Sequence, residues 1–338
     1  MRSGCNLAGA EAFDANASLF HPYLEQYRIR PRRRRAGADR CRHSHRRCAG
    51  QHPFDRQRRG AQWADRAARA CAGGGRSGPH RRRVSVRRGL RPVRRGGAKV
   101  IDRLLAKLRR RDEISAEEEE ALRDAVTETA ELRADVTFIR RGQRLHQSTL
   151  LLSGLMCRYK DLRNGERQVT ELHVAGDFAD LHSFTLKTLD HELMTLTPCT
   201  IGLVPHEKLT RITERFPHLT RVLWFQTNLD AAIHREWEVS LGRRDAAARL
   251  AHLFCELQVR LEIVGMAEAD GYDLALTQTD LSECVGITPV HVNRSLKLLR
   301  EDGLAEFRER RVTLLDRAGL ERAAEFDPGY LYLEPRLA

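Results

Sequence analysis

The spacing of the hydrophobic residues changes near Pro217 from the period of two that begins at Val136 to a helical period, and this change constrains the fold more than any other feature. Before Pro217, apolar and polar residues alternate, as around Leu155, Cys157 and Tyr159. A period of two predicts half-buried β-strands. After Pro217, apolar residues recur every three or four positions, which predicts helices. We therefore expect an α+β chain in which a strand-rich part precedes a helical part.

Short strands joined by tight turns predict an antiparallel β jelly roll before Pro217. A capping box at Ser115–Glu118 begins a helix that precedes the strands. Asn164-Gly165 then has the composition of a hairpin turn, and Gly176-Asp177 turns the chain again. Many short strands with regular turns are typical of a small barrel or jelly roll.

The segment from Pro217 to about Ser240 predicts a long helix that is more apolar than packing against one small barrel requires. A second copy of the chain would account for this excess, so we expect a homodimer along the helix. The alternative is a single helix buried on several sides within one subunit. A second helix is expected from Arg243 to about Ile263. The expected dimer contacts are Leu219, Val222, Leu229 and Ile233.

The segment from Leu276 to Arg300 carries the strongest functional signal. Thr277 is placed to cap a short helix, and Gly286 stands where a turn between helices requires a positive φ. Thr288 then caps a second helix with Pro289 at its first position. A hairpin sequence follows from Gly303, and together these elements predict a winged helix-turn-helix.

The helical wheel of the second helix separates a core face from an outward face. Val292, Ser295, Leu296 and Leu299 share the side expected to face the core. The outward side holds two cations and no acid, which is the arrangement that base edges and phosphates require. The alternative is an ordinary solvated pair of helices. The residues expected to bind double-stranded DNA are Thr277, Thr288, Val290, His291, Asn293, Arg294 and Lys297, with Arg308 and Arg310 in the wing. Arg311 is expected to add positive charge to the wing.

Composition divides the chain near residue 97. Residues 1–97 contain 25 Arg, no Lys and six acidic residues, whereas the rest of the chain has 34 basic and 40 acidic residues. Such an Arg-rich leader has too little apolar surface to form a core, so we expect it to be disordered. Because it contains Arg without Lys, we interpret it as translated GC-rich DNA upstream of a natural start near Val100.

The bulk sequence excludes several other classes. No apolar run reaches the roughly 18 residues of a membrane span, so we expect a soluble, cytoplasmic protein. The eight cysteines form no CxxC pair, and the crowded segment Cys41–Cys48 is surrounded by Arg. We therefore expect no metal site and no cofactor.

From about Asp102 to Pro328 the chain resembles the Crp/Fnr family of bacterial transcription regulators. The segments Gly242–Leu257 and Leu276–Arg294 are similar to those of its alphaproteobacterial members. After the Arg-rich leader at 1–99, the resemblance implies three parts: a jelly-roll sensor at 100–216, a dimerisation helix at 217–241 and a winged helix-turn-helix at 242–338. It also implies a palindromic operator, base reading by Arg294, and RNA polymerase as a candidate partner.

The family's known sensor ligands fit this sequence poorly. Members that bind cyclic nucleotides carry a Gly-Glu pair and an arginine, where this chain has Ala179-Asp180 and Glu192. We therefore expect no cyclic nucleotide, because Glu192 would repel a phosphate. The iron–sulfur branch needs an N-terminal cysteine cluster that Cys157 and the leader cysteines do not form. Candidate haem ligands are His146, His173, His182 and His191, each expected to be an ordinary surface or hydrogen-bonded residue.

Two other functions remain open at this point. A cupin-like barrel enzyme would need a His-x-His pair in the barrel, and the only such pair, His43-Ser-His45, lies in the leader. We therefore expect no enzyme activity. The second is non-specific nucleic-acid binding through the Arg-rich leader. DNA binding by a protein that starts at Val100 would separate it from the regulator hypothesis.

Overall fold

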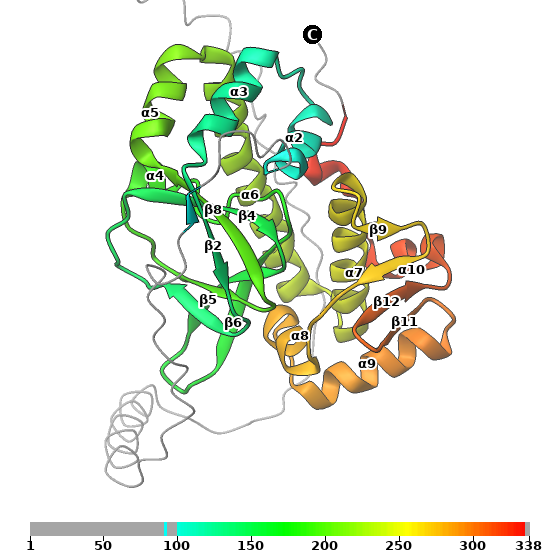
Figure 1. Cartoon of the computed structure of the whole chain (residues 1–338). Helices are drawn as coiled ribbons and strands as arrows, with labels where there is room; N and C mark the ends of the chain where they lie inside the picture. Colours follow the sequence, from blue (N-terminus) through cyan, green and yellow to red (C-terminus); the bar gives the residue numbers. More distant parts are fainter. Residues whose placement is uncertain (1–90, 93–99, 335–338) are drawn as a thin grey trace, which may run out of the picture. The chain divides into compact units, whose positions relative to one another are not determined.

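The computed structural model describes residues 91–92 and 100–334 (Figure 1). The expectations for the leader concern residues 1–99 and lie outside this part, except for the two-residue strand β1 (Arg91–Pro92). That strand pairs antiparallel with β2 (Glu128–Leu132). No helix among the described residues is long and apolar enough to cross a membrane.

Two four-stranded antiparallel sheets form the barrel that the alternating pattern predicted. One has the strand order β1-β2-β8-β4 and the other the order β3-β7-β5-β6. The turn at Asn164-Gly165 joins β5 to β6: Gly165 has φ +89°, and the Glu166 amide donates to the Asn164 side chain. The remaining strands are β3 (Val136–Ile139), β4 (Gln147–Ser153), β5 (Met156–Asp161), β6 (Arg167–His173), β7 (Glu192–Thr195) and β8 (Cys199–Pro205).

Short helices cover one end of the barrel. They are α2 (Asp102–Arg109), α3 (Ala116–Ala125) and α5 (His206–Arg215), while the single-turn α4 (Ser183–Leu186) lies in the loop between β6 and β7. The predicted capping box of α3 is present, with Ser115 and Glu118 each bonded to the other's backbone amide. Helix α5 was not predicted from the sequence; it begins after Pro205 without a side-chain cap.

The long helix α6 (Pro217–Arg243) begins at the expected proline, but three of the four residues assigned to a dimer contact are buried within the chain itself. Leu219 and Val222 pack in a cluster with residues of α2, α3 and α5, and Ile233 packs in a second cluster with α7. Leu229 is partly buried against the same second cluster. The assignment of Leu219, Val222 and Ile233 to a dimer contact is therefore wrong for this conformation, because their own subunit already covers them. For Leu229 the assignment stays a prediction.

Helix α7 (Ala246–Ile263) lies between the barrel and the C-terminal helices. The C-terminal part contains α8 (Gln278–Val285), α9 (Pro289–Glu301), α10 (Arg317–Ala324) and a 3₁₀ turn, η4 (Pro328–Leu331). Its wing is a four-stranded sheet in the order β11-β12-β10-β9. The hairpin of β11 (Ala305–Arg308) and β12 (Arg311–Leu314) was predicted from the sequence. The elements that were not predicted are β9 (Ala267–Glu268), β10 (Gly271–Asp273), α10 and η4.

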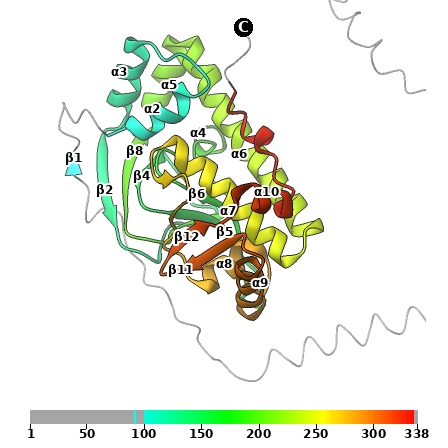
Figure 2. The same cartoon turned by 90° about the vertical axis from the view of Figure 1, so that its right-hand side faces the viewer.

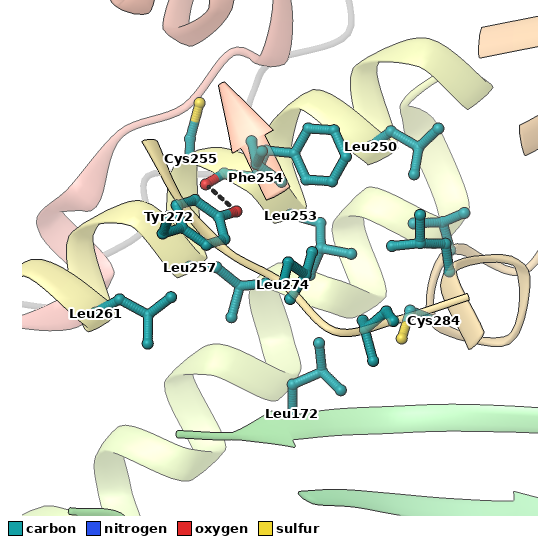
Figure 3. Packing of buried hydrophobic residues seen from close by; sticks show 14 of the residues in the cluster. Leu172, Leu250, Leu253, Phe254, Cys255, Leu257, Leu261, Tyr272, Leu274 and Cys284 are labelled. Carbon is teal, nitrogen blue, oxygen red and sulfur yellow. Dashed lines mark hydrogen bonds between the residues drawn. The ribbon is translucent and has the colours of Figure 1, made fainter. Parts of the chain in front are cut away.

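One hydrophobic cluster joins the barrel to the C-terminal helices. Figure 3 shows Leu172 of β6 facing the α7 side chains Leu253 and Leu257. The hydroxyl of Tyr272 donates to the Phe254 carbonyl at 3.0 Å, which satisfies the buried polar end of the tyrosine. The core is therefore continuous from the sensor barrel to the helix-turn-helix.

A substitution at Gly286 can show how tightly the turn between α8 and α9 is packed. Its φ is +64°, and an added Cβ would lie 3.0 Å from Leu241 and 3.2 Å from the Gln168 side chain. We expect Gly286→Ala to lower the free energy of unfolding by about 1–2 kcal/mol, measured by denaturant titration. Gly303→Ala is the matched control, since Gly303 has φ +69° with open space around it, and its loss should be smaller. A loss at Gly286 no larger than that at Gly303 would contradict the packing.

Candidate DNA-binding surface

The two helices α8 and α9 and the turn between them form the helix-turn-helix that the sequence predicted. The Thr277 hydroxyl accepts from the Asp280 amide at 3.1 Å, and the Asp280 carboxylate accepts from the Thr277 amide in return. Gly286 ends α8 in the left-handed region. Thr288 caps α9 through the His291 amide, with Pro289 at the first helical position. Local hydrogen bonds therefore fix where each helix begins.

Helix α9 has the two faces that the helical wheel assigned. Val292, Ser295 and Leu299 are buried, and Leu296 packs partly buried against the same core. The opposite face is exposed, and Val290 has 73% of its surface accessible. Figures 1 and 2 show α9 at the edge of the molecule, with no other described element covering its outer side. The helix thus presents a polar face with one apolar side chain near its N-terminus.

The structure places all the residues predicted to contact DNA on exposed surface of the helix-turn-helix and wing. The caps Thr277 and Thr288 lie at the N-termini of α8 and α9. The exposed residues of this set are Thr277, Thr288, Val290, His291, Asn293, Arg294, Lys297, Arg308 and Arg310.

The cations of this surface differ in how far acidic neighbours neutralise them. Within the described part of the chain, Arg294 and Arg310 have no ion-pair partner. Lys297 lies 3.5 Å from Glu301, and Arg308 lies 3.3 Å from Glu306, in exposed pairs that contribute little to stability. Arg294 and Arg310 are therefore the cations most available to an anionic partner.

Arg311 was expected to add positive charge to the wing, and this expectation was wrong. Its guanidinium lies 2.7 Å from Glu268, 3.4 Å from Asp273 and 3.6 Å from Asp270. These three carboxylates raise its pKa, with the hydrogen bond to Glu268 the largest cause. Arg311 therefore links β12 to the neighbouring strands of the wing. These ion pairs of Arg311 could not be predicted from the sequence, because the strands β9 and β10 were not expected.

The tip of the wing presents Arg310 through its backbone conformation. Glu309 and Arg310 have φ of +51° and +62°, the positive values of the tight turns that suit a two-residue hairpin. The strands meet at Arg308 and Arg311 on either side. The turn therefore holds Arg308 and Arg310 at the outer end of the hairpin.

Two further features of the surface were not predicted. The Asn293 side chain donates to Gln278 at 3.4 Å, which links the outer faces of α9 and α8. Arg300, at the end of α9, is exposed and has no ion-pair partner among the described residues. Its charge was visible in the sequence, and its position on the helical wheel could have marked it as a flanking phosphate contact.

A cavity of about 760 Å³ lies between the barrel strands and α6. Its lining includes His182 and His191, which the sequence analysis singled out, and the α6 residues His234 and Trp237. Glu192, expected to occupy the phosphate position, is not among its lining residues and instead lies 3.8 Å from Arg140. The expectation that Glu192 would repel a phosphate bound in the cavity is therefore wrong.

The two cations that line the cavity are both paired. Arg158, with 2% of its side chain exposed, donates to Glu171 at 2.6 Å and to Asp230 at 2.8 Å. Lys160 donates to Asp190 at 2.6 Å. An anionic ligand would have to displace one of these carboxylates.

Burial favours the uncharged form of two histidines of the cavity, His182 and His191. Burial, with smaller contributions from Arg158 and His191, lowers the pKa of His182 to about 3. Burial and Arg158 also lower the pKa of His191, against the opposing effect of Asp190. Among the described residues, no group of three or more His, Cys, Asp or Glu side chains is arranged to hold a metal ion.

The comparisons with known proteins agree with this geometry. The model of the Crp-like helix-turn-helix domain matches residues 248–323. A probable transcriptional activator of Rhizobium leguminosarum bv. viciae is 29% identical over 194 residues, which cover 56% of this chain and 79% of that protein. The transcriptional activator FnrL of Cereibacter sphaeroides is 28% identical over 207 residues, covering 59% of this chain and 82% of that protein.

The solved structure of FixK2 from Bradyrhizobium japonicum has a similar fold. It aligns with a TM-score of 0.53 at 22% identity, over 62% of this chain and 98% of that one. Identity this low shows the fold alone. The helix-turn-helix match and the relatives, which are regulators rather than enzymes, identify a DNA-binding transcription regulator of the Crp/Fnr type.

Proposed function

We propose that this regulator binds a palindromic DNA operator as a homodimer and responds to a ligand other than a cyclic nucleotide. In this proposal residues 100–216 are the sensor, 217–241 the dimerisation helix and 242–338 the DNA-binding domain. The observation that carries it is the exposed face of α9, with Arg294 unpaired among the described residues. Because its partner is DNA, the protein would act in the cytoplasm, with RNA polymerase as a further candidate partner.

In this mechanism the N-terminal half of α9 enters the major groove. Arg294 has the length and the paired donors to bind the O6 and N7 atoms of guanine, and Val290 is placed to contact a thymine methyl. Arg308 and Arg310 on the wing, and Lys297 further along α9, would hold phosphates, which sets the register of the helix without reading sequence.

The dimer contact that we propose uses the exposed side of α6 instead of the residues first assigned to it. Trp224 is 67% exposed and Val239 is 50% exposed, while Leu219 and Val222 are buried in their own subunit. A large exposed aromatic residue on a long helix is the kind of side chain that anchors protein interfaces. Two copies related by a two-fold axis would bury Trp224 and present their α9 helices to successive major grooves.

The two alternative functions have weaker support. A barrel enzyme would need convergent catalytic groups in the cavity, where His182 and His191 are desolvated and the carboxylates Asp190 and Asp230 are engaged by cations. Non-specific binding through the leader concerns residues outside the described part of the chain. DNA binding by a protein that starts at Val100 still separates it from the regulator proposal.

We expect Arg294→Ala to reduce operator affinity by about 1–3 kcal/mol at one base pair of each half-site, because a bidentate guanine contact is lost. Lys297→Ala is the matched control, since it removes one cation from the same helix face. It should weaken binding to all sequences alike and make the plot of log affinity against log salt concentration less steep by about one. The measurement is the affinity for duplexes carrying each single-base change. An unchanged preference in Arg294→Ala would refute the assignment of α9.

We expect Trp224→Glu to convert a dimer into a monomer in sedimentation equilibrium and to weaken operator binding, because a charge would replace the apolar anchor of the interface. Leu162→Glu is the control: Leu162 is 56% exposed on the β5–β6 turn, away from α6, and should leave the dimer intact. A wild-type chain that sediments as a monomer, or a Trp224→Glu variant that stays dimeric, would contradict this interface.

We expect titration calorimetry with cyclic AMP or cyclic GMP to give no saturable heat up to about 1 mM ligand. The reason is that Arg158 and Lys160 are already neutralised by carboxylates, so a buried phosphate would lack a free cation. Saturable binding with a micromolar midpoint would show that the cavity accepts the phosphate and that the ion pairs rearrange.

A further inference from the structure

Arg260 of α7 reaches from the C-terminal helices to the sensor barrel. Its guanidinium donates to the Asp177 carboxylate at 2.8 Å and to the Leu172 carbonyl at 2.7 Å, both on the barrel. It also donates to Glu256, one turn away on α7, at 2.8 Å. Only 7% of the Arg260 side chain is exposed, so water does not compete for these hydrogen bonds.

The barrel side of this contact is held in place by other groups. Asp177 lies in the turn after β6, and its carboxylate accepts from the Val174 amide at 2.8 Å. Lys107 of α2 pairs with the second carboxylate oxygen. Burial alone would raise the pKa of Asp177, but Lys107 and Arg260 lower it to about 2, so the group is ionised at physiological pH.

The other side of the contact is held equally firmly. Glu256 has no exposed surface, and its second oxygen accepts from Trp237 of α6 at 3.0 Å and from Tyr330 of η4 at 2.9 Å. Arg260 is therefore the connection between a fixed carboxylate on the barrel and a fixed carboxylate on α7. We call Asp177, Arg260 and Glu256 the clamp.

The clamp also lies close to the wall of the cavity. His173 is fully buried between two carboxylates. Its Nδ1 lies 4.0 Å from Asp177 and 3.9 Å from Glu171. Glu171 in turn holds Arg158, which lines the cavity. A chain of adjacent buried polar groups thus runs from the cavity to α7.

We propose that Arg260 is the positioning residue that fixes the angle of the helix-turn-helix relative to the sensor barrel, and so sets the distance between the two α9 helices of a dimer. This inference rests on the proposed function. A buried ion pair favours one arrangement over others, because a rotation that separates Arg260 from Asp177 loses their mutual attraction, which is strong in a medium of low dielectric. The apolar cluster around α7 gives cohesion, but apolar contacts alone specify the angle less strictly.

Operator spacing reports this angle directly. Each added base pair between the half-sites moves them apart by about 3.4 Å and rotates them by about 34° around the duplex. A rigid pair of recognition helices therefore accepts one spacing, whereas a pair on loosened domains accepts several. Loss of folding would instead weaken binding at every spacing alike.

The test measures the affinity of the full chain for palindromes whose half-sites are separated by the selected spacing and by one or two base pairs more or fewer. Two variants are compared with the wild type. Arg260→Met removes the charge, and Arg260→Lys keeps it but cannot reach both carboxylates and the Leu172 carbonyl. The matched control is Arg317→Met, which breaks an ion pair of 2.6 Å to Glu262 of α7 that does not involve the barrel.

We expect the wild type and Arg317→Met to prefer one spacing by at least about tenfold, and both Arg260 variants to prefer it by less than about threefold. Folded Arg260 variants that keep the tenfold preference would overturn the clamp. If Arg260→Met does not fold, the spacing profile of Arg260→Lys decides. A wild-type chain that binds no duplex, or binds one half-site as well as two, would instead contradict the proposed function.

Discussion

Burial of helix α7 on all sides is the constraint on which the rest of the described structure depends. Every residue from Leu250 to Leu261 is buried, including four polar ones. A helix covered all round must pair its charged side chains internally, since water cannot reach them. Arg260 and Glu256 meet this requirement by bonding to the barrel, to α6 and to η4. The same hydrogen bonds that permit burial therefore determine how the sensor and the DNA-binding helices face each other.

The DNA-binding surface follows from this arrangement. Because α7 and the wing cover Val292 and Leu299, the opposite side of α9 is turned outward with Val290 and Arg294 on it. The wing keeps Arg311 for its own cohesion and leaves Arg310 at its tip. Positive charge is thus available at two separated positions on one surface, which suits a duplex whose phosphates flank the groove that α9 would read.

Local signals allowed the helix-turn-helix to be predicted from the sequence. Thr277, Gly286 and Thr288 act through hydrogen bonds and backbone angles within a few residues, so their pattern is readable without the fold. The same holds for the capping box of α3 and for the turn at Asn164. Helix α5 lacks such a side-chain cap, and β9 and β10 are too short to show a period, which explains why they were missed.

Contacts between distant segments could not be predicted in the same way. A helical period shows which residues of α6 are apolar, but not whether the chain itself or a second copy covers them, and so Leu219 was assigned to the wrong contact. The lining of the cavity could not be predicted for the same reason, since it is formed by segments far apart in the sequence. His191 lies in its wall, and Glu192 does not. The pairing of Arg260 with Asp177 joins residues 83 positions apart, and no local pattern marks it.

The central claim is that α9 reads base pairs and is presented in duplicate. Selection of bound sequences from random duplex DNA with the purified full chain tests it most directly. The account predicts enrichment of an inverted repeat whose half-sites are centred about 10 base pairs apart or at a multiple of that distance. Recovery of no common sequence, or of a single unrepeated motif, would contradict it.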